Sequence, residues 1–484
     1  MHVADLAVIL AYLLGITWFG SRFRKSQQTL KDYFLGGHAA PWWAISLSIV
    51  SAETSTLTVI GTPALSFSGN FGFLQVVFGY LLARIVISTL FLPQYFRGEM
   101  FTAYELMRRR FGERIRKLTA GTFLILRALA EGVRVFAISI IISIVLGTGE
   151  VTSIAVIVCL TLFYTFEGGL TAVIWTDVVQ MFLYVAGAFL SFAVMLQQIP
   201  GGWPHVMDLA TAAHKFDVFD FRFAFNSEFF ARSYSFWAGL LGGCFLTTAS
   251  HGTEQLMVQR LLAARNQRES RLALFSSWAV ILFQFTLFLI IGVLLFVQYA
   301  DHHLPPPKVK DSLYPAFIWA NLPPGVAGLV IAAILAAGMS NLSAALNALA
   351  STTVMDFYKP ISARRNQAHT EEHFLKVARW ATVAWGVVLF AIGLVARNWG
   401  SVLEAGLTIA SILYGSLLGV FLLGLLTKRV KEEPAMVAMV VGLLAMISIK
   451  AFTHIAFTWY VLIGTSITFA TGYLASFAQR KEHV

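Results

Sequence analysis

The sequence is poor in charged residues and almost without cysteine. Only 12% of its 484 residues are Asp, Glu, Lys or Arg, whereas soluble domains carry about 25%, and 57% are hydrophobic. The two cysteines both lie in apolar stretches, so neither a disulfide framework nor a CxxC metal motif exists. No Walker pattern occurs either. These absences exclude an ordinary soluble domain, a disulfide-stabilised scaffold and a nucleotide-hydrolysing protein.

Apolar segments fill most of the chain instead. About 20 apolar residues cross the hydrocarbon core of a bilayer, and about thirteen such segments can be marked. They lie at about 4–20, 42–65, 71–96, 118–147, 150–166, 172–198, 233–256, 273–300, 326–357, 374–396, 401–426, 434–452 and 455–478. The sequence therefore predicts an all-α polytopic membrane protein with about 13 transmembrane helices, forming a single transmembrane domain over residues 1–484.

The basic residues are unevenly distributed among the loops. Alternate loops hold about 24 Lys and Arg residues, against about 6 in the opposite set. Cytoplasmic loops carry such an excess, so we expect a multi-pass protein of the plasma (inner) membrane with its N-terminus outside and its C-terminus in the cytoplasm. This topology and contact with anionic lipids of the bilayer explain the net charge of +10, and no nucleic-acid partner is needed.

Two of the apolar segments are interrupted by polar residues. The segment 42–65 carries Glu53 among serine and threonine hydroxyls, and a charge at membrane depth is costly unless it faces protein or water. The segment 233–256 contains Gly242-Gly243 and ends in the polar run 247–254. Corresponding broken helices in two halves of a membrane protein indicate a binding site near the middle of the bilayer.

The segment 326–357 is rich in small residues, which lets helices approach one another closely. Packing does not explain Ser340, Ser343 and Asn347, which fall on one helix face. Hydroxyl and carbonyl oxygens suit a hard monovalent cation such as Na⁺. Asp177, one turn into the segment 172–198, is either a cap for the start of that helix or a further ion ligand.

Three charged residues share one face of the segment 118–147. Arg127, Glu131 and Arg134 are spaced i, i+4 and i+7. They either form an internally paired triad that holds the helix in the bundle, or leave one arginine to meet an anionic substrate.

At four stretches the chain resembles the sodium/solute symporter family, which includes sodium–sugar, sodium–proline and sodium–sialic acid cotransporters. The stretches are Ser51-Ala52-Glu53, GGLTAVIWTDVVQ from Gly168 to Gln180, HGTEQLMVQRLLA from His251 to Ala263, and LNALASTTVMDFYK ending at Lys359. The resemblance implies a LeuT-like fold of two inverted five-helix repeats, at about 42–198 and 233–426. An extra helix at 4–20 would precede them, and two C-terminal helices would follow within 434–478.

The resemblance also implies where sodium binds. The main site would use the backbone carbonyls of Leu47, Val50 and Ala337 and the side-chain oxygens of Ser340 and Asn341. The family usually has a hydroxyl where Asn341 stands. A second sodium, bound by some members, would use Asp177 and Ser343 together with Ser340, although Ala344 replaces the hydroxyl expected next.

The substrate contacts transfer less directly. Sugar carriers of the family have glutamine at the position of Thr54 and asparagine at that of Glu254, which counts against a galactose-type pocket. Our candidates for the cavity are Glu53, Thr54, Gln75, Arg134, Glu254 and Gln284. If Glu254 supplies the partner for the unpaired arginine among Arg127 and Arg134, the cavity is neutral and suits a sugar or polyol, which is the preferred interpretation. Otherwise Arg134 meets an organic carboxylate.

We therefore expect sodium-coupled import of a small polar organic solute by alternating access, without bond-breaking chemistry and hence without enzyme activity. One alternative is a proton-coupled symporter with Glu53, Asp177 or Glu254 as the proton carrier. Another is a non-transporting membrane sensor of the same fold. The identity of the solute, the number of sodium ions and the oligomeric state stay open.

Overall fold

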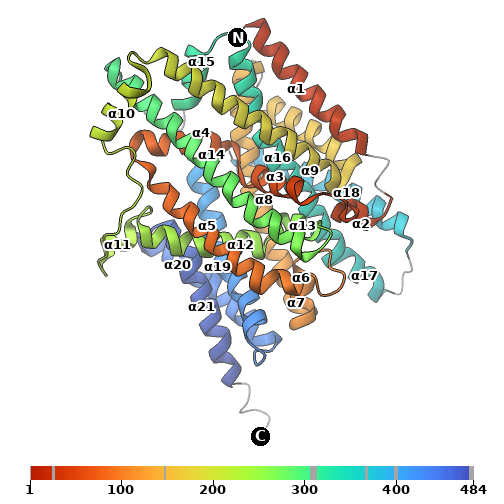
Figure 1. Ribbon diagram of the computed structural model, residues 1–484. Helices are drawn as coiled ribbons and strands as arrows, with labels where there is room; N and C mark the ends of the chain where they lie inside the picture. The colour runs from red at the N-terminus through yellow and green to blue at the C-terminus, as the bar shows by residue number, and fades with distance from the viewer. Residues whose placement is uncertain are drawn as a thin grey trace.

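A computed structural model describes residues 2–23, 28–146, 149–305, 313–365, 369–396 and 402–478. The described chain is a bundle of helices without strands (Figure 1). The helices are α1 (Val3–Ser21), α2 (Leu30–Leu35), α3 (Trp42–Glu53), α4 (Thr56–Ser68), α5 (Leu74–Val86), α6 (Leu92–Tyr95), α7 (Tyr104–Arg110), α8 (Glu113–Leu146), α9 (Glu150–Gln198), α10 (Gly202–Ala212), α11 (Ser227–Ala231), α12 (Gly243–Gly252), α13 (Gln255–Leu262), α14 (Gln267–Asp301), α15 (Leu313–Asn321), α16 (Val326–Thr352), α17 (Lys359–Arg364), α18 (Glu371–Ala396), α19 (Val402–Leu426), α20 (Glu432–Phe452) and α21 (Phe457–Ala478). The short helices α10 and α15 lie on the opposite side of the bundle from α6, α7 and α17 (Figure 1).

The predicted number of thirteen spans is not confirmed. Within the described residues, nine helices are long and apolar enough to cross a membrane, or ten if a bent pair counts as one span. The predicted segment 118–147 falls in α8, the helix that carries the three charges of the predicted triad. The segments 150–166 and 172–198 are the two parts of α9, which are separated by a kink at Gly169, where the φ of 51° and ψ of -151° are not helical and only glycine adopts them at little cost. The segment 233–256 forms a π-helical turn and the short helix α12.

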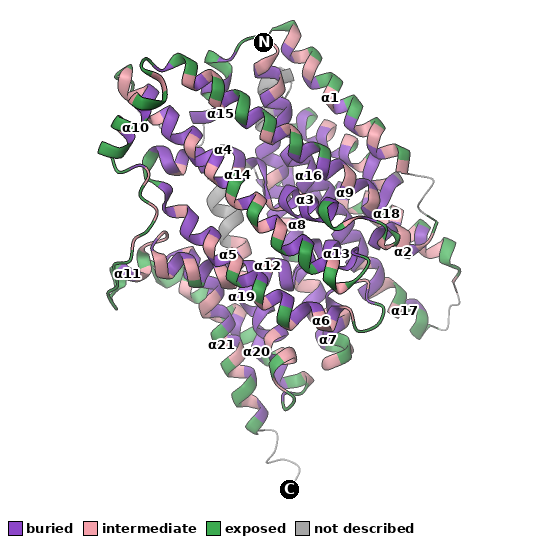
Figure 2. Cartoon of the chain, in the orientation of Figure 1, coloured by how far each residue is buried: buried purple, intermediate pink, exposed green. Residues whose placement is uncertain are grey.

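Helix α16 forms the centre of the bundle. Of its most apolar 18 residues, 94% are buried (Figure 2). It packs against α9, α1, α8 and α18. Small residues permit this closeness: a Cβ added at Gly338 would lie 2.5 Å from the side chain of Ile138 on α8. The predicted use of small residues for close packing is confirmed, and it brings the polar residues of α16 within reach of several helices.

The predicted interruption of the segment 42–65 is also confirmed. Helices α3 and α4 are bent by 64° relative to each other. Thr54 and Ser55 between them have extended backbone angles, and Ser55 caps α4 through a hydrogen bond from the Thr58 amide. A second break separates α12 from α13, at Thr253 and Glu254. The assignment of 42–198 and 233–426 to two inverted repeats stays a prediction.

Candidate functional site

A cavity of about 240 Å³ runs along α4 from the break after α3. Aromatic side chains from several helices form much of its wall, and among the described lining residues only Glu53 and Arg134 are charged. The lining residues are Glu53, Ser55, Thr58, Gly61, Thr62, Leu65, Phe73, Val76, Tyr80, Ala130, Arg134, Tyr234, Leu246, Phe285, Ala410 and Phe457. The cavity therefore offers a polar end at the helix break and an apolar wall.

The predicted charged triad on α8 is present, and one of its arginines also pairs with a carboxylate from outside α8. Glu131 is fully buried and contacts both arginines, with Oε2 at 3.0 Å from Arg127 and 3.2 Å from Arg134. Glu254 lies 3.1 Å from Arg127 and accepts a 2.5 Å hydrogen bond from the Tyr414 hydroxyl. Glu254 was expected to supply the partner for the unpaired arginine of this face; the structure has such a pair, with Arg127, and leaves Arg134 with the carboxylate of Glu131 that Arg127 also contacts.

Arg134 is the member of this cluster that faces the cavity. Its side chain is 29% exposed, compared with 6% for Arg127. Besides its contact with Glu131, its Nη1 donates a 3.2 Å hydrogen bond to Oδ1 of Asn341. Its Nε and Nη2 have no hydrogen-bond acceptor in the part of the chain that the structure describes. Arg134 can thus offer two donors in a fixed fork to a planar anion.

Glu53 reaches the cavity from the end of α3, but its charge is compensated. Its carboxylate lies 3.4 Å from Arg84 and 3.2 Å from Nε2 of His251. Arg84 was not among the predicted site residues, although a lone arginine inside the apolar segment 71–96 was the available signal.

The other substrate candidates pack around the helix break rather than lining the cavity. Gln284 donates a 2.7 Å hydrogen bond to Oγ1 of Thr54. Gln75 donates to the carbonyl of Tyr234 and accepts from the amide of Asp220, so it fastens the outer loop to α5. Thr54, Gln75 and Gln284 are each at most 1% exposed. The structure brings only Glu53 and Arg134 of the predicted set into the cavity.

The residues predicted for sodium lie on α3 and α16, two helices that contact each other. The hydroxyls of Ser51 and Ser340 are 2.8 Å apart. The amide nitrogen of Asn341 donates to the carbonyl of Thr54 at 2.7 Å and to that of Ala337 at 3.3 Å. The carbonyl of Val50 accepts from the amide of Thr54, and Leu47 lies one turn before Ser51 on the same helix. This set consists of oxygens from two helices, and it fits a hard monovalent cation.

Asp177 contacts Ser340 of this set, and its surroundings exclude the interpretation of Asp177 as a helix cap. It lies about two turns after the kink at Gly169, and its carboxylate contacts side chains of other helices, so it is not a helix cap. Its Oδ1 accepts from Ser340 at 2.7 Å, and its Oδ2 lies 2.8 Å from Arg260 and accepts from Ser48 at 2.5 Å. The hydroxyl of Ser343 bonds to the carbonyl of Ser340. The possible second sodium site thus has a carboxylate that already holds a guanidinium. Arg260 stands in the quoted stretch from His251 to Ala263, but its partner was not foreseen.

Comparison with known proteins places this geometry in a family. The family model for the sodium:solute symporter family matches residues 33–442. The chain belongs to the sodium:solute symporter family. It is 27% identical to the sodium/sialic acid symporter SiaT of Proteus mirabilis, over 99% of this chain and 96% of that protein. It is also 27% identical to sodium-coupled monocarboxylate transporter 2 of Bos taurus, over 91% of this chain and 71% of that protein.

Solved structures agree with the predicted LeuT-like fold. The substrate-bound, outward-open state of a Na⁺-coupled sialic acid symporter superposes with a TM-score of 0.88 at 26% identity, covering 98% of both chains. A nucleobase-cation-symport-1 family transporter shares the fold, with a TM-score of 0.58 at 11% identity. The chain is therefore a multi-pass, sodium-coupled symporter and not an enzyme. Sodium is its coupling ion, so the proton-coupled alternative is not supported.

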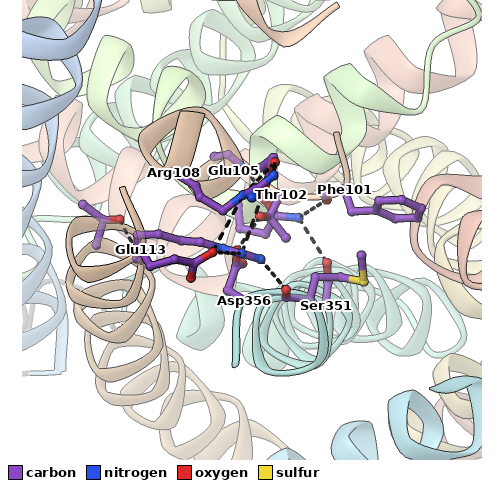
Figure 3. A network of polar contacts seen from close by, with 12 residues as sticks. Phe101, Thr102, Glu105, Arg108, Glu113, Ser351 and Asp356 are labelled. Carbon is purple, nitrogen blue, oxygen red and sulfur yellow. Dashed lines mark hydrogen bonds and ion pairs between the residues drawn. The ribbon is translucent and has the colours of Figure 1, made fainter. Parts of the chain in front are cut away.

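A second polar network lies just beyond the end of α16, in the π-helical turn Thr353–Tyr358. At the end of α16 the buried carboxylate of Asp356 lies 2.7 Å from Nε of Arg116 and accepts from Thr102 at 2.9 Å. Nearby, Gln255 donates to the carbonyl of Phe101 and to Ser351 (Figure 3). These contacts join α13, α16 and the arginine-rich loop that we expect in the cytoplasm. We call these contacts the closure; they border a cavity of about 500 Å³ whose lining includes Thr102, Glu105 and Arg116.

Glu105 borders this closure from α7. Burial would raise the pKa of Glu105, but hydrogen bonds and charge from Arg108, with the charge of Arg116, outweigh it and hold that pKa below its ordinary value. The carboxylate contributes to stability above its unfolded-state pKa, and this contribution is lost only as the pH falls through the lowered pKa. Glu105 therefore stays ionised and paired with its arginines at neutral pH.

Replacing Asp356 with alanine should open this end more often. The change leaves the Arg116 guanidinium without its closest carboxylate, and breaking a buried pair costs about 3–5 kcal/mol. We expect a cysteine in place of the buried Ser351 to react with a maleimide at least about tenfold faster, since about 1.4 kcal/mol is a factor of ten. The rate is measured with Cys159 and Cys244 replaced by serine.

The matched control is Lys376→Ala, which removes an exposed ion pair with Glu372. It should leave the maleimide rate unchanged. Equal rates in the Asp356→Ala protein and the parent would show that these contacts do not hold the closure.

Proposed function

We propose that this symporter imports a small organic carboxylate together with sodium, and that Arg134 binds the carboxylate. The observation that carries the proposal is the exposure of Arg134 to the cavity while Glu254 is engaged by Arg127 and Tyr414. The preference for a sugar or polyol assumed that pairing with Glu254 makes the cavity neutral; Glu254 does pair with an arginine of the triad, Arg127, but Arg134 still faces the cavity with only a shared carboxylate. Relatives named for sialic acid and for monocarboxylates agree with a carboxylate.

Binding of a carboxylate here follows from charge and shape. Arg127 has two carboxylate partners, whereas Arg134 has only a share of Glu131. A substrate carboxylate would complete the pairing of Arg134 through two parallel hydrogen bonds, in a site with little competing water. The aromatic wall of the cavity would take the remainder of the solute.

The test is binding to the purified full-length protein in detergent. Sialic acid, propionate and galactose are compared in thermal-shift titrations with sodium and with choline as the replacing cation. A ligand of the folded state raises the melting temperature with its concentration. We expect a sodium-dependent shift with a carboxylate and none with galactose. A shift with galactose alone would overturn the assignment to carboxylates.

Sodium is proposed to bind between α3 and α16, at the carbonyls of Leu47, Val50 and Ala337 and the side chains of Ser340 and Asn341. Such an ion would hold the two helices together while the cavity is open, and their separation at the other end would release it. Asp177, with Ser340 and Ser343, stays the candidate for a second ion. The outside position of the N-terminus is proposed from the distribution of basic residues among the loops, and import is proposed because a sodium gradient directed inward would drive the coupled solute inward.

Replacing Ser340 with alanine should weaken the sodium dependence of uptake by about tenfold or more. The change removes one oxygen from a buried ligand set, which costs about 1–3 kcal/mol. The sodium concentration for half-maximal uptake into proteoliposomes is the measurement. The control is Thr176→Ala, since that buried hydroxyl bonds only within α9. An unchanged sodium requirement in Ser340→Ala would place the ion elsewhere.

A further inference from the structure

One hydrogen bond joins the cavity to the proposed sodium site. Nη1 of Arg134 donates to Oδ1 of Asn341 at 3.2 Å, from α8 to α16. Asn341 follows Ser340 directly and is 1% exposed. The residue proposed to receive the substrate therefore touches a side chain proposed to bind the ion.

The orientation of the Asn341 amide is fixed by its partners. Its nitrogen faces the carbonyls of Thr54 and Ala337, at 2.7 and 3.3 Å, and both can only accept. Its oxygen must then face Arg134, which can only donate. Only this oxygen of the side chain can coordinate a cation, so the guanidinium and a sodium ion would share one ligand atom.

Because they would share this atom, a sodium ion and the guanidinium of Arg134 would repel each other. A sodium ion on Oδ1 of Asn341 lies close to a guanidinium of the same sign, inside a buried site where charges are poorly screened. Glu131 compensates Arg134 only in part, because Arg127 uses the same carboxylate oxygen. The ion is therefore disfavoured while Arg134 holds Asn341.

We propose that Asn341 couples substrate to sodium: a carboxylate that takes Arg134 away from Asn341 releases the amide oxygen, and the amide can then turn this oxygen, in place of its nitrogen, toward the ion and the carbonyl of Ala337. This rests on the proposed function, in which Arg134 binds the carboxylate. The bound carboxylate also neutralises the guanidinium, so sodium affinity rises when substrate is present. By linkage, sodium raises the affinity for the carboxylate by the same factor.

The side chain at this position determines whether such a link can exist. The hydroxyl that the family usually has is shorter than an amide and carries its oxygen on Cβ. A serine hydroxyl remains near the ion ligands of α3 but ends one bond short of the position from which Asn341 contacts Arg134. Asn341 is thus a positioning residue for coupling as well as an ion ligand.

The experiment measures sodium affinity of the purified full-length protein with and without saturating sialic acid or propionate, by thermal shift. In the parent, the carboxylate should raise sodium affinity by about tenfold, within the usual range of coupling between sites. In Asn341→Ser, sodium affinity without carboxylate should rise, and the enhancement should fall below about twofold. Asn341→Thr, like Asn341→Ser, carries its hydroxyl on Cβ, and it serves as the second variant if the serine protein is poorly folded.

The matched control is Asn347→Ser, six residues along the same helix. Asn347 is equally buried, and its amide oxygen accepts from Gln259. This variant loses the same amide from α16 without touching Arg134, so the enhancement should stay near its parental value. A loss of enhancement in Asn347→Ser as well would mean that α16 was merely loosened.

The outcomes separate this inference from the proposed function. If the carboxylate raises sodium affinity equally in the parent and in Asn341→Ser, the coupling role of Asn341 is wrong and the carboxylate site stands. If no carboxylate changes the sodium affinity of a folded, sodium-binding parent, the proposed function itself fails. Weaker sodium binding by Asn341→Ser in the absence of carboxylate would also overturn the inference, since release from Arg134 should strengthen it.

Discussion

Carboxylate uptake should fall about 10- to 150-fold when Arg134 is replaced by lysine, in a protein that still folds. Lysine keeps the positive charge and can still reach Glu131, but its ammonium is a point charge and cannot form two parallel bonds to one carboxylate. Losing one hydrogen bond to a charged group costs about 1.5–3 kcal/mol, and this range gives the expected decrease. Sodium-driven uptake of labelled sialic acid or propionate into proteoliposomes is the measurement.

Two observations control this result. Arg222→Lys makes the same replacement at an exposed ion pair with Asp220 in the outer loop and should change uptake little. The melting temperature of Arg134→Lys should stay close to that of the parent, because Glu131 keeps a cationic partner. Full carboxylate uptake by Arg134→Lys would remove Arg134 from the substrate site.

Replacing Arg260 with methionine should strongly destabilise the protein. Arg260 and Asp177 are both fully buried and 2.8 Å apart. Arg260 also donates to Ser48 and to the carbonyl of Leu256. Removing one charge leaves the other buried without its partner, at a cost of about 3–5 kcal/mol. We expect a large loss of thermal stability in detergent, measured by the fraction that stays monodisperse after heating.

The double substitution Asp177→Asn with Arg260→Met tests the reason for this loss. With both charges gone, no uncompensated charge remains, and stability should recover in part although the ion pair is absent. A matched exposed pair is Arg232–Glu228, where Arg232→Met should cost little. A double variant as unstable as Arg260→Met alone would show that the arginine acts through packing and not through its charge.

Patterns along one helix were predictable from the sequence, and pairings between helices were not. The face shared by Arg127, Glu131 and Arg134 follows from helical periodicity, and the polar residues of 42–65 indicated a broken helix. The partner of Arg127 is 127 residues away, and that of Asp177 is 83 residues away. The helix that lies next to each charged side chain depends on how the whole bundle packs. The hydropathy of the sequence does not predict that packing.

The same limit applies to Asp177. Hydropathy predicted separate segments at 150–166 and 172–198, and the structure confirms a break between them at Gly169, whose lack of a side chain permits the unusual φ. The sequence placed Asp177 about one turn into the second segment, where a helix cap was one interpretation. Its partners Ser340 and Arg260 lie on α16 and α13, and the spacing of apolar residues does not show them.

The break between α3 and α4 also has an electrical consequence. A continuous helix would place its opposite partial charges, each about half an elementary charge, at its two distant ends. Ending α3 at Glu53 and starting α4 at Thr56 creates a second pair of ends within the protein. The negative end of α3 carries the carbonyl of Val50, and the positive end of α4 borders the cavity. A cation and an anion bound on either side of Thr54 would each lie beside a pole of opposite sign, and would leave as a pair whose charges cancel.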